Sequence, residues 1–433
     1  MAFDLNSYDL RTPRTSSGMA LFHMGHRLLT PGSCDVARLR GYLRLKTWLD
    51  CRSTSERVHV TKVAAKLPAR ALRESLRAIR ANGAVAEREG VPARVQLAHL
   101  MWLWLRHGVH PPTYYEFRLY RKGQLRRAPL FLQGDEDDLL FRLLHVRIAR
   151  DEAELMVDKR RFEKWLVAHG FPTLRTLAEF SDGAYSVDTR DGRLPQVDLF
   201  VKPNDSLQGF GTERWLIEGD AWRGPSGRRS EEELLCELAE RSKQRPLLLQ
   251  QLYRNAHELA CIAPRALGTI RLLTLRDLDE NVSIVAAVAK IPTGDAQTDH
   301  MRLGGIAAPI EVATGRLSTG VTKAKYGFVS ECTHHPDTGV ALEGFQMPRW
   351  NEACDLAINA HRALKQLVCI GWDIAILDSG PVIVEGNDNP GHTSSQMPTG
   401  IALGETPVTK VVLRRLEDSF GNGTRGQITP KLA

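Results

Sequence analysis

Apolar side chains recur at helical spacing in several stretches of the chain. These stretches are 69–83, 95–104, 158–170, 231–243 and 350–368. In the first stretch, Leu72, Leu76 and Ile79 form one apolar stripe, and the many arginines around them predict a helix that is exposed on its other face. The second stretch is more uniformly apolar and ends near Gly108, so we expect a largely buried helix there.

Strands are predicted where short runs of apolar and β-branched residues lie between turn signals. Such runs occupy 197–203, 247–252, 268–276 and 283–291. The segment PPTYYEFRLYRKGQLRRAPLFL (111–132) alternates aromatic and charged residues, and this alternation also favours strands.

One further pair of predicted strands carries three oxygen donors. In GWDIAILDSGPVIVEGNDNP (371–390), two apolar runs flank Asp-Ser-Gly, which predicts a β-hairpin. Glu385 and Asn387 should project to one face of it, and Asp373 can face them from the paired strand if the register allows. Hard oxygen ligands of this kind suit Mg²⁺. The alternative is a hairpin whose polar residues simply face solvent.

Three cations stand at places where an anion would be needed. Arg271 and Lys290 each interrupt an otherwise apolar strand, so each should meet a carboxylate or a phosphate unless it extends to solvent at a sheet edge. Lys202 ends another strand, and the loop after it contains Gly209 and Gly211. Such a loop lets backbone N–H groups approach phosphate oxygens, although an ordinary turn has the same composition.

The size and composition describe a globular protein of two or three domains. The chain has 433 residues, of which 42% are hydrophobic and 25% charged. We expect no membrane span, because no run of about 18 apolar residues is present. The first residues lack the pattern of a secretory signal, and the seven cysteines include no Cys-x-x-Cys pair. These features predict a cytoplasmic protein with reduced thiols.

The positive charge belongs to the N-terminal third. Residues 1–130 contain 23 Lys and Arg against 9 Asp and Glu, a balance of +14, whereas the remainder has 35 against 42, a balance of −7. This third could attract a phosphorylated or uronic substrate, an anionic carrier or membrane surface, or nucleic acid. The absence of a motif with interleaved aromatic residues argues against a nucleic-acid partner. The alternative to any anionic partner is an arginine-rich surface that only contacts solvent.

The order of these motifs resembles the ATP-grasp superfamily. The motifs are Lys159 with Phe162, FVKP with its glycine loop, LLQQL, TIR, Gly304-Gly305, GWDIA and VEGN. PPTYYEFRLY, HHPDTG, MPRW and IGWDIAI look like the branch called sugar-transfer associated ATP-grasp proteins, which is similar to alpha-L-glutamate ligases. The resemblance implies an α+β fold with two subdomains that clasp ATP, 152–252 with a lid and 253–433 with the metal site. A basic, mainly helical region, 1–151, would precede them.

The resemblance also implies how a nucleotide is held. Lys159 and Lys202 would contact its phosphates, and the loop with Gly209 and Gly211 would close over them. The adenine and ribose contacts implied for the strand 247–252 and the segment after it are Gln250 or Gln251 near the exocyclic amine, the backbone amide of Leu252, and Glu258 at the ribose.

The same resemblance assigns the chemistry. Asp373, Glu385 and Asn387 would hold one or two Mg²⁺ ions, and Arg271 would steady an acyl phosphate together with Lys202. Lys290 stands where this branch is expected to have arginine, so a point charge replaces a planar fork. His392, just past the hairpin, is a candidate for meeting substrate.

These parts imply an ADP-forming ligase that activates a carboxylate as an acyl phosphate for attack by an amine, in the biosynthesis of a natural product or a modified sugar or peptide. The substrates would be small molecules, anionic or carrier-bound, and a homodimer is a reasonable expectation. Two alternatives stay open: a phosphotransferase that stops after phosphorylation, and a nucleotide-binding module without catalysis.

Overall fold

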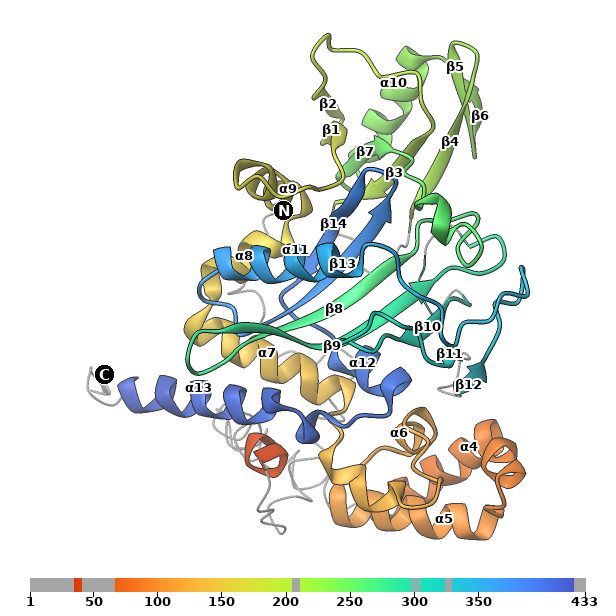
Figure 1. Cartoon of the computed structure of the whole chain (residues 1–433), viewed down its shortest axis with the longest axis vertical. Helices are drawn as coiled ribbons and strands as arrows, with labels where there is room; N and C mark the ends of the chain where they lie inside the picture. Colours follow the sequence, from red (N-terminus) through yellow and green to blue (C-terminus); the bar gives the residue numbers. More distant parts are fainter. Residues whose placement is uncertain are drawn as a thin grey trace.

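The structure is built on two antiparallel β-sheets of seven strands each, one above the other in Figure 1. This computed structural model describes residues 35–40, 67–204, 211–296, 299, 301, 304–323 and 329–423. The strand order is β2-β1-β7-β3-β4-β5-β6 in the first sheet and β12-β11-β10-β9-β8-β13-β14 in the second.

The first sheet is covered by one helix. Its strands are β1 (Thr176–Ser181), β2 (Ala184–Val187), β3 (Leu199–Pro203), β4 (Glu213–Glu218), β5 (Ala221–Gly224), β6 (Gly227–Arg229) and β7 (Leu247–Gln251). Helix α10 (Glu231–Ser242) begins after Ser230, whose hydroxyl accepts the N–H of Glu233 while the Glu233 carboxylate accepts that of Ser230. The apolar side of α10 packs on Trp215 and Trp222.

The second sheet lies between two helical layers. Its strands are β8 (Thr269–Arg276), β9 (Val282–Ile291), β10 (Ile306–Pro309), β11 (Gly320–Lys323), β12 (Val329–Cys332), β13 (Cys369–Leu377) and β14 (Gly380–Asn387). Helix α11 (Trp350–Ala363) packs against Ile270, Leu272, Trp372 and Ile374 on one face. The residues between these, including Arg271 and Asp373, therefore belong to the opposite face.

Three helices lie on that opposite face (Figure 1). They are α7 (Gly134–Ile148), α12 (His392–Thr399) and α13 (Pro407–Gly423). Leu140 and Leu144 of α7 share a core with Leu275 and Cys369 of the sheet. Only part of this face is covered by apolar contacts, and the rest carries the charged residues of the candidate site.

Most of the helices and strands predicted from the sequence are present. All four predicted strands and the hairpin are confirmed, as are the helices at 95–104, 158–170, 231–243 and 350–368. Helix α11 ends at Ala363, earlier than predicted, because the chain turns extended at Leu364 before entering β13. Short 3₁₀ turns at η3 (His257–Leu259) and η5 (Leu403–Glu405) complete this part of the chain.

The N-terminal region pairs two helices, α4 (Leu67–Arg88) and α5 (Ala93–Trp102), and continues in a π-helical turn, η1 (Leu103–His107). In α4 the expected apolar stripe is not the buried one, because Leu72 and Leu76 are 44% and 41% exposed. The buried side consists of small residues instead: Ala71, Ser75, Ala78, Asn82 and Ala86. Small side chains allow the two helices to approach closely, and this packing decided which face is buried.

The prediction of strands in 111–132 is wrong. The segment forms a short helix, α6 (Pro111–Glu116), turns and a 3₁₀ stretch, η2 (Gln124–Leu130). Prolines at the first two positions favour the start of a helix. The neighbouring Tyr114 and Tyr115 are both buried, which a half-exposed strand would not permit.

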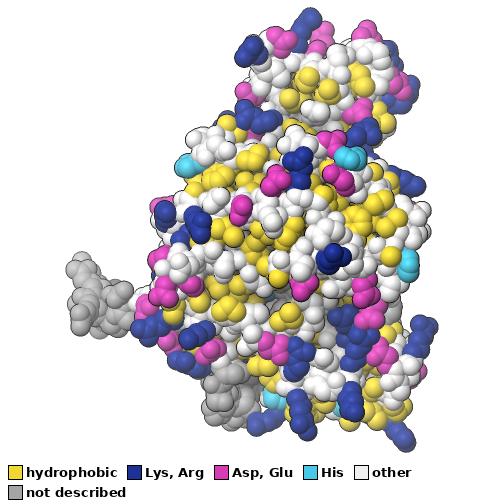
Figure 2. Space-filling model, viewed as in Figure 1, with side chains coloured by type: hydrophobic (Ala, Val, Ile, Leu, Met, Phe, Trp, Pro, Cys, Tyr) yellow, Lys and Arg dark blue, Asp and Glu magenta, His cyan; other side chains and the backbone are white. Residues whose placement is uncertain are grey.

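The surface of this region carries many basic side chains. Figure 2 shows them around the lower part of the molecule, over α4 to α6, with acidic side chains interspersed. Within the described residues, no helix combines the length and the apolar character needed to cross a membrane.

The helices α8 (Arg150–Val157) and α9 (Lys159–Ala168) connect the two sheets. Asp158 ends α8 and begins α9, since its carboxylate accepts the N–H groups of Arg160 and Arg161 at 3.0 and 3.1 Å. Both helices contact β14 at Gly386, where a side chain would meet the Met156 methyl group and, at 2.9 Å, the Phe162 ring. The missing side chain thus lets α9 pack directly beside the residues on β14.

We expect Gly386→Ala to destabilise the protein by about 1–3 kcal/mol, the usual cost of overpacking a core. Urea unfolding measures this loss. Met156→Ala should cost less stability in the Gly386→Ala background than in the parent, and this difference is the rescue, because the methyl group nearest the new side chain is then gone. Loss of stability without any rescue by Met156→Ala would contradict the proposed contact.

Candidate active site

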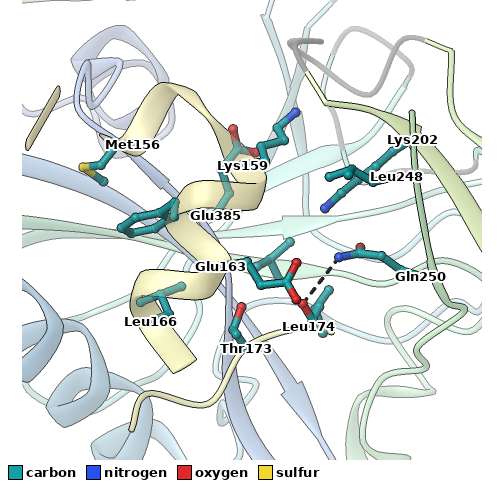
Figure 3. Close-up of a pocket in the computed structure, with 12 residues that line it drawn as sticks. Met156, Lys159, Glu163, Leu166, Thr173, Leu174, Lys202, Leu248, Gln250 and Glu385 are labelled. Carbon is teal, nitrogen blue, oxygen red and sulfur yellow. Dashed lines mark hydrogen bonds between the residues drawn. The ribbon is translucent and has the colours of Figure 1, made fainter. Parts of the chain in front are cut away.

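A pocket opens between the two sheets, with one wall from α9, one from β3 and β7, and one from β14. Lys159, Lys202, Gln250 and Glu385, all predicted from the sequence as site residues, line it. Lys202 and Gln250 extend from the first sheet, opposite Lys159 and Glu163 of α9 (Figure 3). The space between these walls is about 360 Å³, including space open to solvent.

Lys202 is an unusually placed cation. Burial of the ammonium group and, second, the neighbouring charge of Lys159 lower the pKa of Lys202 to about 8, while Glu385 and Glu163 oppose this shift. The group is thus still protonated at neutral pH, and it carries its charge at a cost that an anionic ligand would relieve.

Glu163, which was not predicted from the sequence, lines the same pocket. It accepts hydrogen bonds from the backbone N–H of Thr176 at 2.8 Å, from the Thr176 hydroxyl and from Arg160 at 2.9 Å. Gln250 donates to the same Thr176 hydroxyl at 3.4 Å. The available sequence signal was the spacing of Lys159 and Glu163, because residues four apart share one face of a helix.

An ion cluster lies on the second sheet beside this pocket. Asp373 accepts hydrogen bonds from Arg271 Nε and Nη2 at 2.7 and 2.9 Å, and Lys290 Nζ lies 2.9 Å from Asp373 Oδ1. The side chains of Arg271, Lys290 and Asp373 are only 14%, 17% and 8% exposed. The prediction that both buried cations meet a carboxylate is confirmed, and the same carboxylate serves both.

The two cations explain why the carboxyl group of Asp373 is ionised. Burial alone would raise the pKa of its carboxyl group, but Arg271 and Lys290 outweigh burial and hold the pKa at about 2. Asp299, which the sequence did not single out as a site residue, lies nearby. Its carboxylate accepts a hydrogen bond from Thr269, and burial raises its pKa.

The register of the hairpin brings Glu385 to the same face as Asp373. Ile374 pairs with Ile383, yet Asp373 pairs with Glu385, so Val384 is an extra residue in β14. Without this bulge Asp373 would lie opposite Val384, and Glu385 would point to the face covered by α11. The bulge therefore gives the hairpin the register that was required, in which Asp373 and Glu385 face the same side of the sheet.

The oxygen donors fit Mg²⁺ in part. The Asn387 side-chain N–H donates to Gly371 O at 3.1 Å, which leaves the side-chain oxygen to act as a ligand. No hydrogen bond or ion pair joins Glu385 to another residue in the described ranges, so its carboxylate is also available. Asp373 already serves two cations, and a metal ion would have to share it. Glu385 and Asn387 therefore suit the ion better than Asp373 does.

The remaining predicted residues lie outside the pocket lining. Gln251 is exposed at the end of β7. The Leu252 N–H donates to Asp198 O at 2.7 Å and would have to break this bond to reach a nucleotide. Gly211 has a left-handed backbone at φ +78°, as a glycine turn requires, and Gly209 lies outside the described residues.

Glu258 is exposed and lies beside His257, whose Nδ1 is 3.2 Å away. The same nitrogen lies 3.3 Å from Asp378 in the turn of the hairpin. Asp378 is five residues beyond Asp373, or roughly 16 Å along an extended strand. Glu258 is therefore not among the residues that line the pocket with the two lysines.

We expect Asp373→Asn to destabilise the protein by about 3–5 kcal/mol at pH 7, because Arg271 and Lys290 lose their shared counter-charge. In the parent, this contribution is complete above the ordinary aspartate pKa and is lost as the pH falls towards about 2. Urea unfolding between pH 2 and 7 measures it. Asp295→Asn, in an exposed pair with Arg265, is the control and should change stability by less than about 0.5 kcal/mol. Equal effects of the two variants would refute the role of the cluster.

We expect Lys202→Met to stabilise the ligand-free protein by about 1–2 kcal/mol at pH 7, since it removes a desolvated charge. The native pKa of about 8 lies below the ordinary lysine pKa of 10.5, so the unfolded chain binds more protons between these values. The parent therefore gains stability as the pH rises through this window, and the advantage of the variant shrinks. Thermal unfolding at pH 7, 9 and 10.5 tests this, with the exposed Lys164→Met as control. A constant difference across these pH values would be the contrary result.

The solved structures that are similar include a D-alanine–D-alanine ligase from Bacillus anthracis, at 15% identity and a TM-score of 0.36, covering 62% of this chain and 70% of that one. A biotin carboxylase from Campylobacter jejuni, complexed with an ATP analogue, matches at 13% identity and a TM-score of 0.34, covering 60% and 47% of the two chains. These likenesses are distant, and no curated protein matches in sequence. The family described as sugar-transfer associated ATP-grasp matches residues 144–411, more than half of the chain. The chain belongs to this family and has the α+β fold of ATP-grasp proteins.

Proposed function

We propose that the protein is an ATP-dependent, ADP-forming ligase that phosphorylates a carboxylate and joins the resulting acyl group to an amine. The observation that carries this proposal is the pocket in which Lys159, Lys202 and Glu385 converge beside the Arg271–Asp373–Lys290 cluster. Cations for phosphates and an available carboxylate for a metal ion are the groups that phosphoryl transfer needs.

The nucleotide would lie between the two sheets. Lys159 and Lys202 would bind its phosphates, and the lowered pKa of Lys202 is consistent with a group that gains most when an anion arrives. Apolar side chains such as Leu174 and Leu248 in the same pocket suit a purine ring, and Gln250 supplies a polar group at its edge. The bond of the Leu252 amide to Asp198 makes Gln250 the better candidate for the adenine contact.

Mg²⁺ would be held by Glu385 and Asn387, with Asp373 shared between the ion and its two cations. Bound there together with the phosphates, the ion supplies charge neutralisation for the transferring phosphoryl group. Because Lys202 and Glu385 line the same pocket, the lysine would orient the phosphates next to the metal ligands.

Arg271 and Lys290 would receive the acid. The bonds to Asp373 and to Pro390 O use three of the five N–H groups of Arg271, and the guanidinium therefore has donors left for a carboxylate or phosphate oxygen. Lys290 adds a mobile point charge from the neighbouring strand. Both would stabilise the negative charge that builds up when an amine attacks the acyl phosphate.

We expect Glu385→Gln to weaken Mg²⁺-dependent ATP binding by about tenfold or more, or 1.4 kcal/mol, while binding without metal changes little. Calorimetry with and without Mg²⁺ measures this difference. The control is Glu240→Gln, a change at an exposed side chain on α10. A variant that keeps the full metal dependence would exclude Glu385 as a metal ligand.

The reaction type is tested by screening ADP release over pooled acids and amines. A ligase releases ADP and phosphate efficiently only when an acid and an amine are both present. A phosphotransferase releases ADP without an amine, and a binding module binds ATP without releasing ADP in any mixture. Absence of ATP binding by the parent protein would overturn the proposed function.

A further inference from the structure

The loop after β14 together with the first residue of α12, residues 388–392, is held at both ends by one helix. This loop follows directly after the proposed metal ligand Asn387. Its first residue, Asp388, and its last, His392, both bond to side chains of α7. The helix belongs to the N-terminal half of the chain and contributes no side chain to the pocket lining.

The contact at the far end of the loop is made by Asp137. One carboxylate oxygen accepts the backbone N–H of His392 at 2.7 Å, and the other lies 2.7 Å from His392 Nδ1. A carboxylate only accepts, so Nδ1 carries the hydrogen of this bond. Asp137 is 3% exposed and His392 is 0% exposed, which corrects the expectation that His392 meets substrate. The Phe141 ring stacks on the imidazole at 5.0 Å.

The contact at the near end is made by His145, whose Nδ1 lies 3.0 Å from Asp388 Oδ2. Asp137, Phe141 and His145 are four residues apart along α7 and therefore share one face of the helix. This face lies along the loop from end to end. The Nε2 atoms of His145 and His392 are buried and have no hydrogen-bond partner among the described residues, so each ring is held through Nδ1 alone.

The middle of the loop touches the ion cluster. Pro390 O accepts a hydrogen bond from Arg271 Nη1 at 3.0 Å, and the other two nitrogens of that guanidinium bind Asp373. The loop also lies tightly against β13, because a side chain at Gly371 would come within 2.9 Å of Pro390 O. Side-chain contacts thus join α7 to both ends of the loop, and the middle of the loop is joined by a hydrogen bond to Arg271, which binds Asp373.

We propose that Asp137 and His145 are positioning residues for the phosphoryl-transfer site: by fixing the loop 388–392, they fix the guanidinium of Arg271 and the amide of Asn387. This inference rests on the proposed function for the chemistry, but the mechanical link rests on the contacts alone. Both residues act through others, since neither lines the pocket. Groups that orient metal ligands in this way commonly change metal affinity or activity by about 10–100-fold when removed.

The first test is hydrogen exchange of the ligand-free protein, followed by mass spectrometry. In Asp137→Ala and His145→Ala, amides in the loop and in β8 around Arg271 should exchange about tenfold faster, because the loop opens locally. Glu136→Gln is the matched control. Glu136 neighbours Asp137 and is equally buried, but it pairs with Arg40 at 2.8 Å and Gln133 at 3.1 Å rather than with the loop. Exchange that rises equally in the control would overturn the proposal.

A second test distinguishes a role of His392 through its Nδ1 hydrogen bond from a role through its Nε2 atom. His392→Asn keeps a donor near the position of Nδ1 and should retain the parent's exchange pattern, whereas His392→Leu should behave like Asp137→Ala. Failure of His392→Asn to rescue would show that Nε2 is the atom that matters and would overturn the positioning role.

The functional readout is the Mg²⁺ concentration that half-saturates ATP binding. We expect Asp137→Ala to raise it about tenfold and to leave metal-free ATP affinity unchanged, because Lys159 and Lys202 lie on other elements. An unchanged Mg²⁺ requirement would overturn the proposal. If the parent shows no Mg²⁺-dependent binding, the proposed function fails, and the exchange experiment still decides the role of α7.

Discussion

The carboxylate of Asp373 is the charge on which the active face of the second sheet depends. It lies on β13, between β8 and the edge strand β14, and binds two buried cations that would each be costly without it. Because Arg271 sits directly opposite on β8, while Lys290 comes from β9, the cluster ties three adjacent strands together through side chains as well as backbone. The same strand pairing sets Glu385 beside the cluster, so the ion pairs and the candidate metal ligands share one geometry.

The sequence could predict this cluster only in outline. A cation within an apolar strand requires an anion, and this reasoning correctly indicated that Arg271 and Lys290 are paired. It could not identify the anion, because Arg271 and Asp373 are separated by 102 positions and meet only through the order of strands in the sheet. On β3 and β7, the place of Lys202 at the end of a strand before a glycine loop pointed to that lysine, and the family resemblance pointed to both Lys202 and Gln250.

The predictions failed where packing chose among equivalent local patterns. In α4, a leucine stripe and a stripe of small residues both have helical spacing, and close contact with α5 buried the small one. In 111–132 the two prolines and adjacent buried tyrosines outweighed an alternation that would also suit a strand. Neighbouring acidic residues at the start of α7 have different partners in the structure, since Glu136 completes a capping box while Asp137 bonds to His392, more than 250 positions away.

The extra residue in β14 has a consequence for how such sites arise and how they are recognised. If the same residues paired without the bulge, the hairpin would retain its turn and much of its apolar face, yet Glu385 would lie opposite Trp372 and be directed into the core. A change in strand pairing could therefore abolish the site while leaving every motif intact in an alignment. In hairpins of this kind, the position of a bulge between the turn and the first carboxylate is as much a part of the active-site signature as the carboxylate itself.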